Sequence, residues 1–179
     1  MHAPPEYAKP YEEAGLSTNV AHFFGMIANI DDNVGGLRSW LADKGVADNT
    51  IFIFTTDNGT AAGGSVFDAG MRGKKGREYD GGHRVPFFLH WPDGGYSEES
   101  MIETITAHVD IVPTLIDFAG IEPPEDVVFD GVSIRPLLES GDKVADWPDR
   151  ILVTDSQRVK DPIKWRKSSV MTDQWRLVS

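Results

Sequence analysis

Residues 48–59, DNTIFIFTTDNG, decide how this chain folds. The β-branched and aromatic run at residues 51–55 is typical of a strand buried on both faces, as in the centre of a parallel sheet covered by helices. Asn58-Gly59 ends the strand, because Asn-Gly is a strong turn signal. Residues 59–82 are rich in glycine and lack hydrophobic periodicity, which predicts a long loop. Ligands of open α/β sheets bind beyond the carboxyl ends of strands, so this loop is where a site is expected.

The flanking patterns complete an alternation of helices and strands. Apolar residues recur at three- and four-residue steps from Val20 to Leu41, which predicts a helix capped by Ser17 or Thr18 and ended by Gly45. The other predicted elements are an extended surface segment at residues 1–17, strands at 85–91, 151–154 and 175–178, a helix at 110–119 capped by Asp110, and a short helix from Pro136. This order indicates an α/β sheet.

Composition excludes several classes of protein. The 179 residues carry a formal net charge of −11, which argues against a nucleic-acid partner because phosphate binding needs clustered Lys and Arg. The absence of cysteine excludes disulfides, zinc–thiolate sites and a cysteine nucleophile. No apolar run is long enough to span a bilayer, so no transmembrane segment is predicted.

Asp57 and Asn58 are candidate metal ligands, because a carboxylate and an amide carbonyl are hard oxygen donors suited to Ca²⁺ or Mg²⁺. The alternative is an Asn-Gly turn in which Asp57 caps the next segment, and spacing alone favours that turn. Lys75, in the run RGKKG at residues 72–76, could converge with backbone N–H groups on an oxyanion. For an isolated Gly-Lys stretch, a solvated basic loop is the favoured alternative.

The remaining polar candidates are assigned structural roles. His22 lies on the long helix beside aromatic core residues, and Asp31 belongs to a solvated helix face. His83 has no neighbour that completes an acid–base pair. His108 and Asp110 have the spacing of a metal pair, but we interpret them as a strand-end residue and a helix cap.

The order and spacing of these motifs resemble the sulfatase family. Residues 48–59 resemble the segment in which a buried strand delivers an Asp-Asn pair to calcium. Residues 72–86, RGKKGREYDGGHRVP, resemble the Gly-x-Lys-Gly … Tyr-Glu-Gly-Gly-x-Arg-Val-Pro signature of that family. HVDIVPTL at residues 108–115 and DGVSIRPLL at residues 130–138 are similar to its following helix and later loop. The resemblance covers nearly the whole chain.

The resemblance implies roles for particular residues. Asp57 and Asn58 would be two of the calcium ligands. Lys75 would be a catalytic and substrate-binding residue that holds the sulfate oxygens and stabilises charge in the transition state. Asp80 stands where the family usually has Glu. Asn58 favours a sulfatase over related phosphatases and phosphodiesterases, which tend to carry His there for a second metal.

The resemblance also implies a fold and a division of labour. We expect an alkaline-phosphatase-like mixed α/β sheet flanked by helices, with residues 1–149 as the C-terminal half of the domain and residues 150–179 as the start of a small antiparallel subdomain. The family's formylglycine arises in a Cys/Ser-x-Pro-Ser-Arg motif, which this sequence lacks. That nucleophile and the other calcium carboxylates are expected in a missing N-terminal part.

The expected activity is calcium-dependent hydrolysis of a sulfate ester by the full-length enzyme, with this chain inactive alone and able to self-associate through an exposed sheet edge. The alternatives are a phosphoester or phosphonate hydrolase of the same superfamily and a non-catalytic binding domain. Members of the family are often periplasmic, secreted or lysosomal, and the sequence does not choose among these locations.

Overall fold

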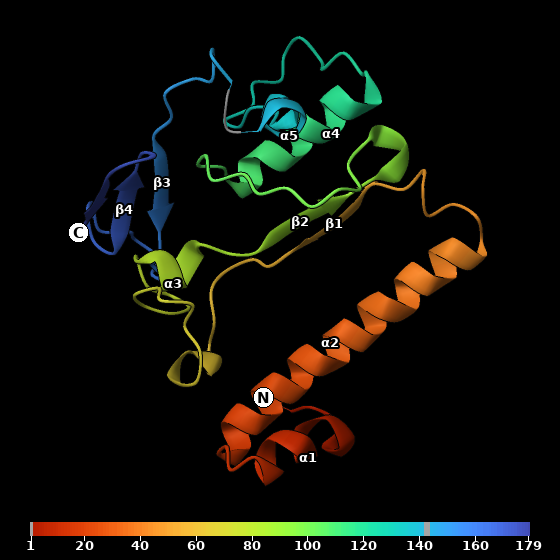
Figure 1. Ribbon diagram of the computed structural model, residues 1–179. Helices are drawn as coiled ribbons and strands as arrows, with labels where there is room; N and C mark the ends of the chain where they lie inside the picture. The colour runs from red at the N-terminus through yellow and green to blue at the C-terminus, as the bar shows by residue number, and fades with distance from the viewer. Residues whose placement is uncertain (1, 142–143) are drawn as a thin grey trace. The chain divides into compact units, whose positions relative to one another are not determined.

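The computed structural model describes residues 2–141 and 144–179 (Figure 1). The chain divides into two compact units. The first comprises Met1–Ser97 and Ser156–Lys167, and the second comprises Glu98–Asp155 and Ser168–Ser179. The predicted boundary between the main α/β domain (residues 1–149) and the small C-terminal subdomain (residues 150–179) is a different division, and it stays a prediction. Within the described residues, no helix has both the length and the apolar character needed to cross a membrane.

The first unit begins with two packed helices, α1 (Pro5–Glu13) and α2 (Thr18–Asp43). The extended conformation expected for residues 1–17 is therefore wrong over α1, where Pro5 occupies the first helical position that proline favours. The prediction of α2 is confirmed, and Gly45 follows it with φ +68°. The helices approach closely, because a Cβ added to Gly25 of α2 would lie 2.9 Å from the backbone nitrogen of Ala8 in α1.

Strands β1 (Phe52–Thr55) and β2 (Phe87–His90) pair side by side in the first unit (Figure 1). Their pairing is antiparallel, with Phe52 opposite His90 and Thr55 opposite Phe87. The prediction that β1 lies in a parallel sheet is thus wrong for its pairing with β2. In the described residues β2 is the only strand paired with β1, so the other edge of β1 carries no ladder.

The long loop between β1 and β2 is not structureless. It contains a 3₁₀ turn, η1 (Gly63–Ser65), and one turn of α-helix, α3 (Asp80–His83). Gly59 lets its two ends meet, because a Cβ added there would overlap the carbonyl oxygen of Gly81. The second end is itself tightly folded, because a Cβ added to Gly82 would overlap the carbonyl oxygen of Arg77. The segment that follows β1 and the start of α3 therefore lie in backbone contact. After β2, the chain makes a further 3₁₀ turn, η2 (Pro92–Gly94).

The second unit combines short helices with a small sheet. It contains η3 (His108–Asp110), α4 (Ile111–Ala119) and α5 (Arg135–Ser140). The strands β3 (Leu152–Asp155), β4 (Ser168–Met171) and β5 (Arg176–Val178) form an antiparallel sheet in the order β3-β4-β5. The strands predicted at residues 151–154 and 175–178 correspond to β3 and β5, whereas β4 was not predicted, since its serines gave no strand pattern.

A buried ion pair organises the second unit. The Arg150 guanidinium donates to both carboxylate oxygens of Asp110 at 2.7 Å, and the exposed fractions of the two side chains are 7% and 1%. The same carboxylate accepts the backbone N–H groups of Ala107 and Val132. Asp110 stands at the N-cap position of α4, as predicted, but its carboxylate makes no cap hydrogen bond to that helix. The prediction of His108 as a strand-end residue is wrong, because His108 lies in a 3₁₀ turn.

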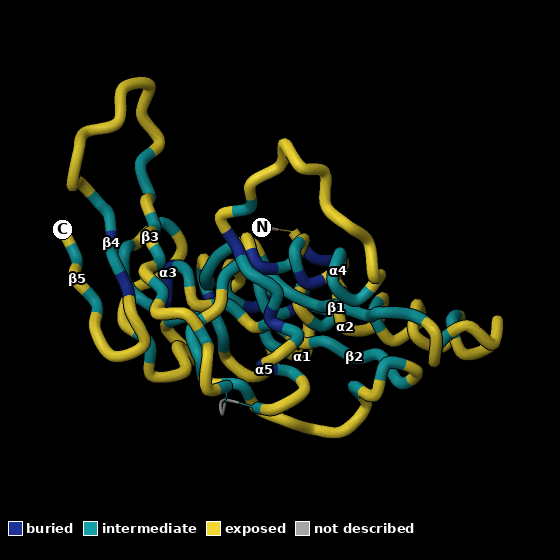
Figure 2. The backbone as a smooth tube through the Cα atoms, turned by 90° about the horizontal axis from the view of Figure 1, so that it is seen from above, coloured by how far each residue is buried: buried dark blue, intermediate teal, exposed yellow. Residues whose placement is uncertain are grey.

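The hydrophobic core is small for the length of the chain. In the described residues, the buried hydrophobic side chains are Ala3, Ala8, Ala21, Ile134, Leu137 and Met171. Along α2, by contrast, Ile27, Ile30, Leu37 and Trp40 are 47–54% exposed, and Figure 2 shows α2 and β2 largely in the colours of exposed and intermediate residues. One apolar face of the first unit is therefore open.

The Asp110–Arg150 pair gives a first prediction. Arg150→Ala should lower the free energy of unfolding of the second unit by about 3–5 kcal/mol, because it leaves a buried carboxylate without its cation. Arg135→Ala is the matched control: Arg135 pairs with Asp117 and Glu139, but its side chain is 42% exposed, so this change should lower the free energy of unfolding far less than Arg150→Ala does. Urea denaturation followed by near-ultraviolet circular dichroism measures both, and equal losses would contradict the assignment.

The glycine contacts give a second prediction. Gly82→Ala should open the loop, and hydrogen exchange should show lost protection of the Gly59 amide, which donates to the Gly82 carbonyl at 3.0 Å. Gly36→Ala is the control, because nothing lies within 4 Å of the added methyl group on α2. That change should stabilise the helix by about 0.5–1 kcal/mol. Unchanged protection of Gly59 in Gly82→Ala would show that the contact does not hold the loop.

Candidate functional site

Asp57 and Asn58 lie directly beyond the end of β1. Asp57 is exposed and Asn58 half-buried. The Asn58 amide donates to the Asp57 carboxylate, and the Thr56 hydroxyl donates to the Asn58 backbone carbonyl at 3.3 Å. The two candidate ligands are thus side by side on a short turn anchored to the strand.

Lys75 lies in the same loop cluster although it is 17 residues further along the chain. Its backbone N–H donates to the carbonyl oxygen of Thr60 at 2.9 Å, and its side chain is exposed. Since Thr60 follows Gly59, this bond ties the lysine to the turn that carries Asp57 and Asn58. The structure therefore places Lys75 in backbone contact with the segment that directly follows Asp57 and Asn58.

The segment around Lys75 is folded back on itself by local contacts. Gly73 and Gly76 adopt φ values of +88° and +78°, which side chains disfavour. The Gly81 N–H donates to the Arg72 carbonyl at 2.8 Å, and the Arg72 guanidinium lies 3.8 Å from the centre of the Tyr79 ring. These contacts hold Lys75 on a defined turn, with Asp80 at the start of α3.

The donor set fits part of a cation site. A carboxylate and an amide carbonyl are oxygen ligands of the kind that Ca²⁺ prefers, but Ca²⁺ takes about six to eight of them. Over the described part of the chain, no group of three His, Asp or Glu side chains is placed to hold a metal. Asp57 and Asn58 could therefore supply some of the ligands, and the others would have to come from elsewhere.

Sequence reasoning missed two features that support this cluster. Thr60 contributes the carbonyl oxygen that holds Lys75, and a backbone acceptor leaves no trace in residue type. The second is Ser156–Lys167, which belongs to the first unit although it is distant in sequence. The Gly81-Gly82 pair was the available signal, because adjacent glycines indicate close backbone approach. His22, by contrast, has the structural role predicted for it: its Nδ1 accepts the backbone N–H of Ala3 at 3.0 Å.

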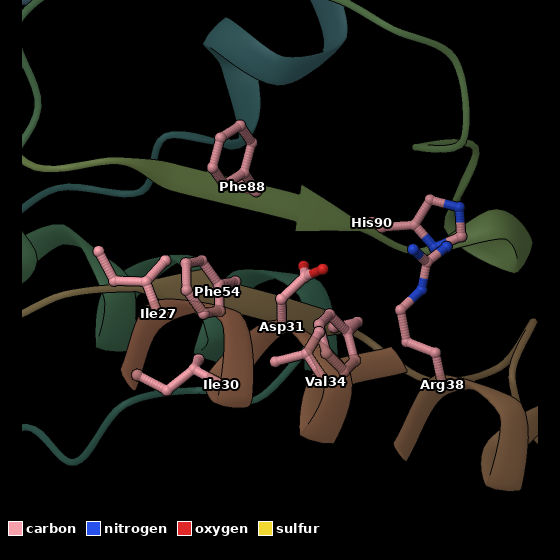
Figure 3. Close-up of a pocket in the computed structure, with 9 residues that line it drawn as sticks. Ile27, Ile30, Asp31, Val34, Arg38, Phe54, Phe88 and His90 are labelled. Carbon is pink, nitrogen blue, oxygen red and sulfur yellow. The ribbon is translucent and has the colours of Figure 1, made fainter. Parts of the chain in front are cut away.

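A separate groove of about 430 Å³ lies between α2 and the β1–β2 pair. Its lining is mostly apolar, with Ile27, Ile30 and Val34 of α2 facing Phe54 and Phe88, and Arg38 and His90 lie at one end (Figure 3). None of Asp57, Asn58 and Lys75 lines it. The groove is part of the open apolar face of the first unit and is distinct from the candidate site.

Two family models match the chain. The sulfatase model matches residues 1–121, and the model of the C-terminal part of N-sulphoglucosamine sulphohydrolase matches residues 73–179. Among curated proteins, the chain is 34% identical over 128 residues to an N-acetylglucosamine-6-O-sulfatase of Bacteroides thetaiotaomicron and 32% identical over 145 residues to the human N-acetylgalactosamine-6-sulfatase. These alignments cover 70% and 78% of this chain but only 21% and 27% of the relatives, so the chain spans about a quarter of their length.

Solved structures of related folds superpose on the chain. A crystal structure of Ps i-CgsB in complex with k-i-k-neocarrahexaose superposes with a TM-score of 0.82 at 24% identity, covering 98% of this chain and 37% of that one. A phosphonate monoester hydrolase of Agrobacterium radiobacter superposes with a TM-score of 0.62 at 28% identity, covering 89% and 32%. The mixed α/β fold of the alkaline-phosphatase type is confirmed. From the family model over residues 1–121 and these relatives, the chain belongs to the sulfatase family.

Proposed function

We propose that this chain supplies the calcium-ligand turn and the sulfate-binding lysine of a sulfuric ester hydrolase. The observation that carries the proposal is the backbone bond from Lys75 to Thr60, which fixes the lysine against the turn of Asp57 and Asn58. An ammonium group next to a cation site can bind a sulfate ester from two sides. The family membership supports hydrolysis of a sulfate ester as the reaction.

The roles follow from the chemistry of each side chain. Asp57 and Asn58 would hold Ca²⁺ through a carboxylate and a carbonyl oxygen. Bound there, the cation would act as a Lewis acid on a sulfate oxygen. Lys75 would donate hydrogen bonds to the sulfate oxygens, and these bonds would strengthen as negative charge develops on them in the transition state. The exposed position of Lys75 leaves its ammonium group accessible to a substrate.

The attacking group is proposed to lie outside this sequence. The chain has no cysteine, and none of its serines stands in the Ser-x-Pro-Ser-Arg context from which formylglycine would be made. The remaining calcium carboxylates are likewise proposed to come from the part of the protein that matches the rest of the relatives' length. The 179 residues alone should therefore bind ligands weakly and not turn them over.

One alternative has a specific observation in its favour. The phosphonate monoester hydrolase that shares the fold suggests a phosphonate or phosphoester substrate. Asn58 favours the sulfatase, because an amide is a poorer ligand than histidine for the second metal expected of phosphoester hydrolases. A non-catalytic binding domain is the remaining alternative, and it predicts no turnover of any ester by the longer protein.

Turnover by a longer protein that includes the N-terminal region tests the role of Lys75. It should hydrolyse an aryl sulfate faster than the matched aryl phosphate or phosphonate. Lys75→Ala should lower kcat for the sulfate by about 10²–10³-fold, the usual cost of losing one donor to a developing oxyanion. Lys74→Ala is the matched control, because this neighbouring lysine is also exposed and has no proposed role. Faster phosphonate turnover would favour the alternative, and equal effects of the two lysine changes would remove Lys75 from the mechanism.

Calcium titration of the 179-residue chain tests Asp57 directly. With only two side-chain ligands, we expect binding in about the millimolar range, typical of weak sites. Asp57→Ala should abolish it and remove any rise in melting temperature caused by calcium, since only a ligand of the folded state stabilises it. Asp43→Ala is the control, because Asp43 is exposed at the end of α2. Unchanged binding in Asp57→Ala would show that the ligand assignment is wrong.

A further inference from the structure

The segment Ser156–Lys167, SQRVKDPIKWRK, has a charge opposite to that of the chain as a whole. It holds five of the 17 Lys and Arg residues and one acidic residue, Asp161, in a protein with a net charge of −11. A concentration of positive charge in an acidic chain creates a local potential that attracts anions. Figure 2 shows the segment between β3 and β4 exposed over most of its length.

This segment is a closed loop with a defined conformation. The Ser156 N–H donates to the Lys167 carbonyl at 3.0 Å, which closes its base. The Gln157 side chain spans the interior: its Nε2 donates to the Ile163 carbonyl and its Oε1 accepts the Ile163 N–H, both at 2.9 Å. Trp165 and Lys167 adopt φ values of +68° and +52°. Left-handed backbone at residues with side chains costs free energy and clusters at functional sites.

The loop presents an aromatic ring together with cations. Trp165 is 64% exposed, and the Lys164 ammonium group lies 4.8 Å from the centre of its ring. Arg158 and Lys160 are also exposed. In the described part of the chain, Arg158, Lys160 and Lys164 have no carboxylate within ion-pair distance. Their charges are therefore available to a ligand.

The base of the loop lies against the turn that carries Lys75. A Cβ added to Gly76 would lie 3.8 Å from the Ser156 hydroxyl oxygen, and Gly76 is the residue after Lys75. Loop and turn belong to the same compact unit. A ligand whose sulfate ester reaches Lys75 therefore has this loop next to it.

We propose that Ser156–Lys167 is a subsite for an anionic glycan, which it binds next to the sulfate-ester site. Arg158, Lys160 and Lys164 bind sulfate or carboxylate groups on neighbouring sugar units, and the Trp165 ring packs against the apolar face of a sugar ring. This inference rests on the proposed function, and it names the substrate class as a sulfated oligosaccharide instead of a small aryl sulfate. The concentration of cations in one short loop of an acidic chain fits an oligosaccharide better than the long array of phosphates on a nucleic acid, which needs cations spread over a larger surface.

Binding of a heparin-derived oligosaccharide to the 179-residue chain tests the subsite without requiring turnover. The combined variant Arg158→Ala, Lys160→Ala, Lys164→Ala should weaken binding by roughly threefold to a hundredfold, the range expected for the loss of three exposed ion pairs. Trp165→Ala should weaken it about threefold to tenfold, the range expected for an aromatic contact. Trp40→Ala with Lys44→Ala is the matched control: Trp40 is 54% exposed and Lys44 lies 5.9 Å from its ring centre. This control should bind as the unchanged chain does.

Three results would overturn the subsite. The first is that the triple variant binds heparin as tightly as the unchanged chain and has the same melting temperature. The second is that the Trp40→Ala, Lys44→Ala control loses as much heparin binding as the triple variant, and the third is that the chain binds duplex DNA as tightly as heparin at the same ionic strength. Failure of the proposed function is distinguishable from these. If the longer protein hydrolyses no sulfate ester but the loop variants still lose heparin binding, the subsite stands and the catalytic proposal fails. If sulfate esters are hydrolysed and the loop variants change neither heparin binding nor the KM for a sulfated oligosaccharide, the subsite alone fails.

Discussion

The close approach of two backbone segments, the Asp57–Gly59 turn and the Gly81-Gly82 pair, is the constraint on which the candidate site depends. A side chain at Gly59, Gly81 or Gly82 would occupy space that carbonyl groups already fill. Because Gly59 carries no Cβ, the turn after β1 can contact the start of α3, and Gly81 and Gly82 allow the segment around Lys75 to pack against that start. Lys75 is bonded to Thr60, next to this turn, through the folded-back loop and not through a regular element of secondary structure.

Much of this arrangement could be predicted from the sequence. The apolar period of α2 and the strand run before Asp57 are strong local signals, since each is set by burial of one stripe or one segment. Asp57, Asn58 and Lys75 were identified because the order and spacing of the motifs that contain them resemble those of the sulfatase family. The antiparallel pairing of β1 with β2 was not predicted. A strand buried on both faces has the same residue composition whether its neighbour runs parallel or antiparallel to it. Asp110 occupies the predicted N-cap position of α4, but its ion pair with Arg150 was not predicted, since the two residues lie 40 positions apart and spacing carries no information on such a pair.

The open apolar face and the incomplete ligand set occur in the same unit. The apolar side of α2 and the groove against Phe54 and Phe88 are open, and β1 has β2 as its only partner in the residues that the structure describes. The chain likewise provides two oxygen ligands where a calcium site needs more. Both deficits lie on the first unit, and the chain spans about a quarter of the length of its curated relatives.

The second unit shows how a small domain compensates for a limited core. Asp110 joins η3, the loop at Val132 and Arg150 through four hydrogen bonds to one carboxylate. Thr114 extends this network, because its hydroxyl donates to the Asp110 carbonyl and accepts the Ile134 N–H at the start of α5. Hydrogen bonds are directional, whereas hydrophobic contacts are not. A fully bonded polar network of this kind therefore favours a single arrangement of the loops that it joins. The polar network therefore fixes the local geometry from which β3 begins, and the loop Ser156–Lys167 starts directly after that strand.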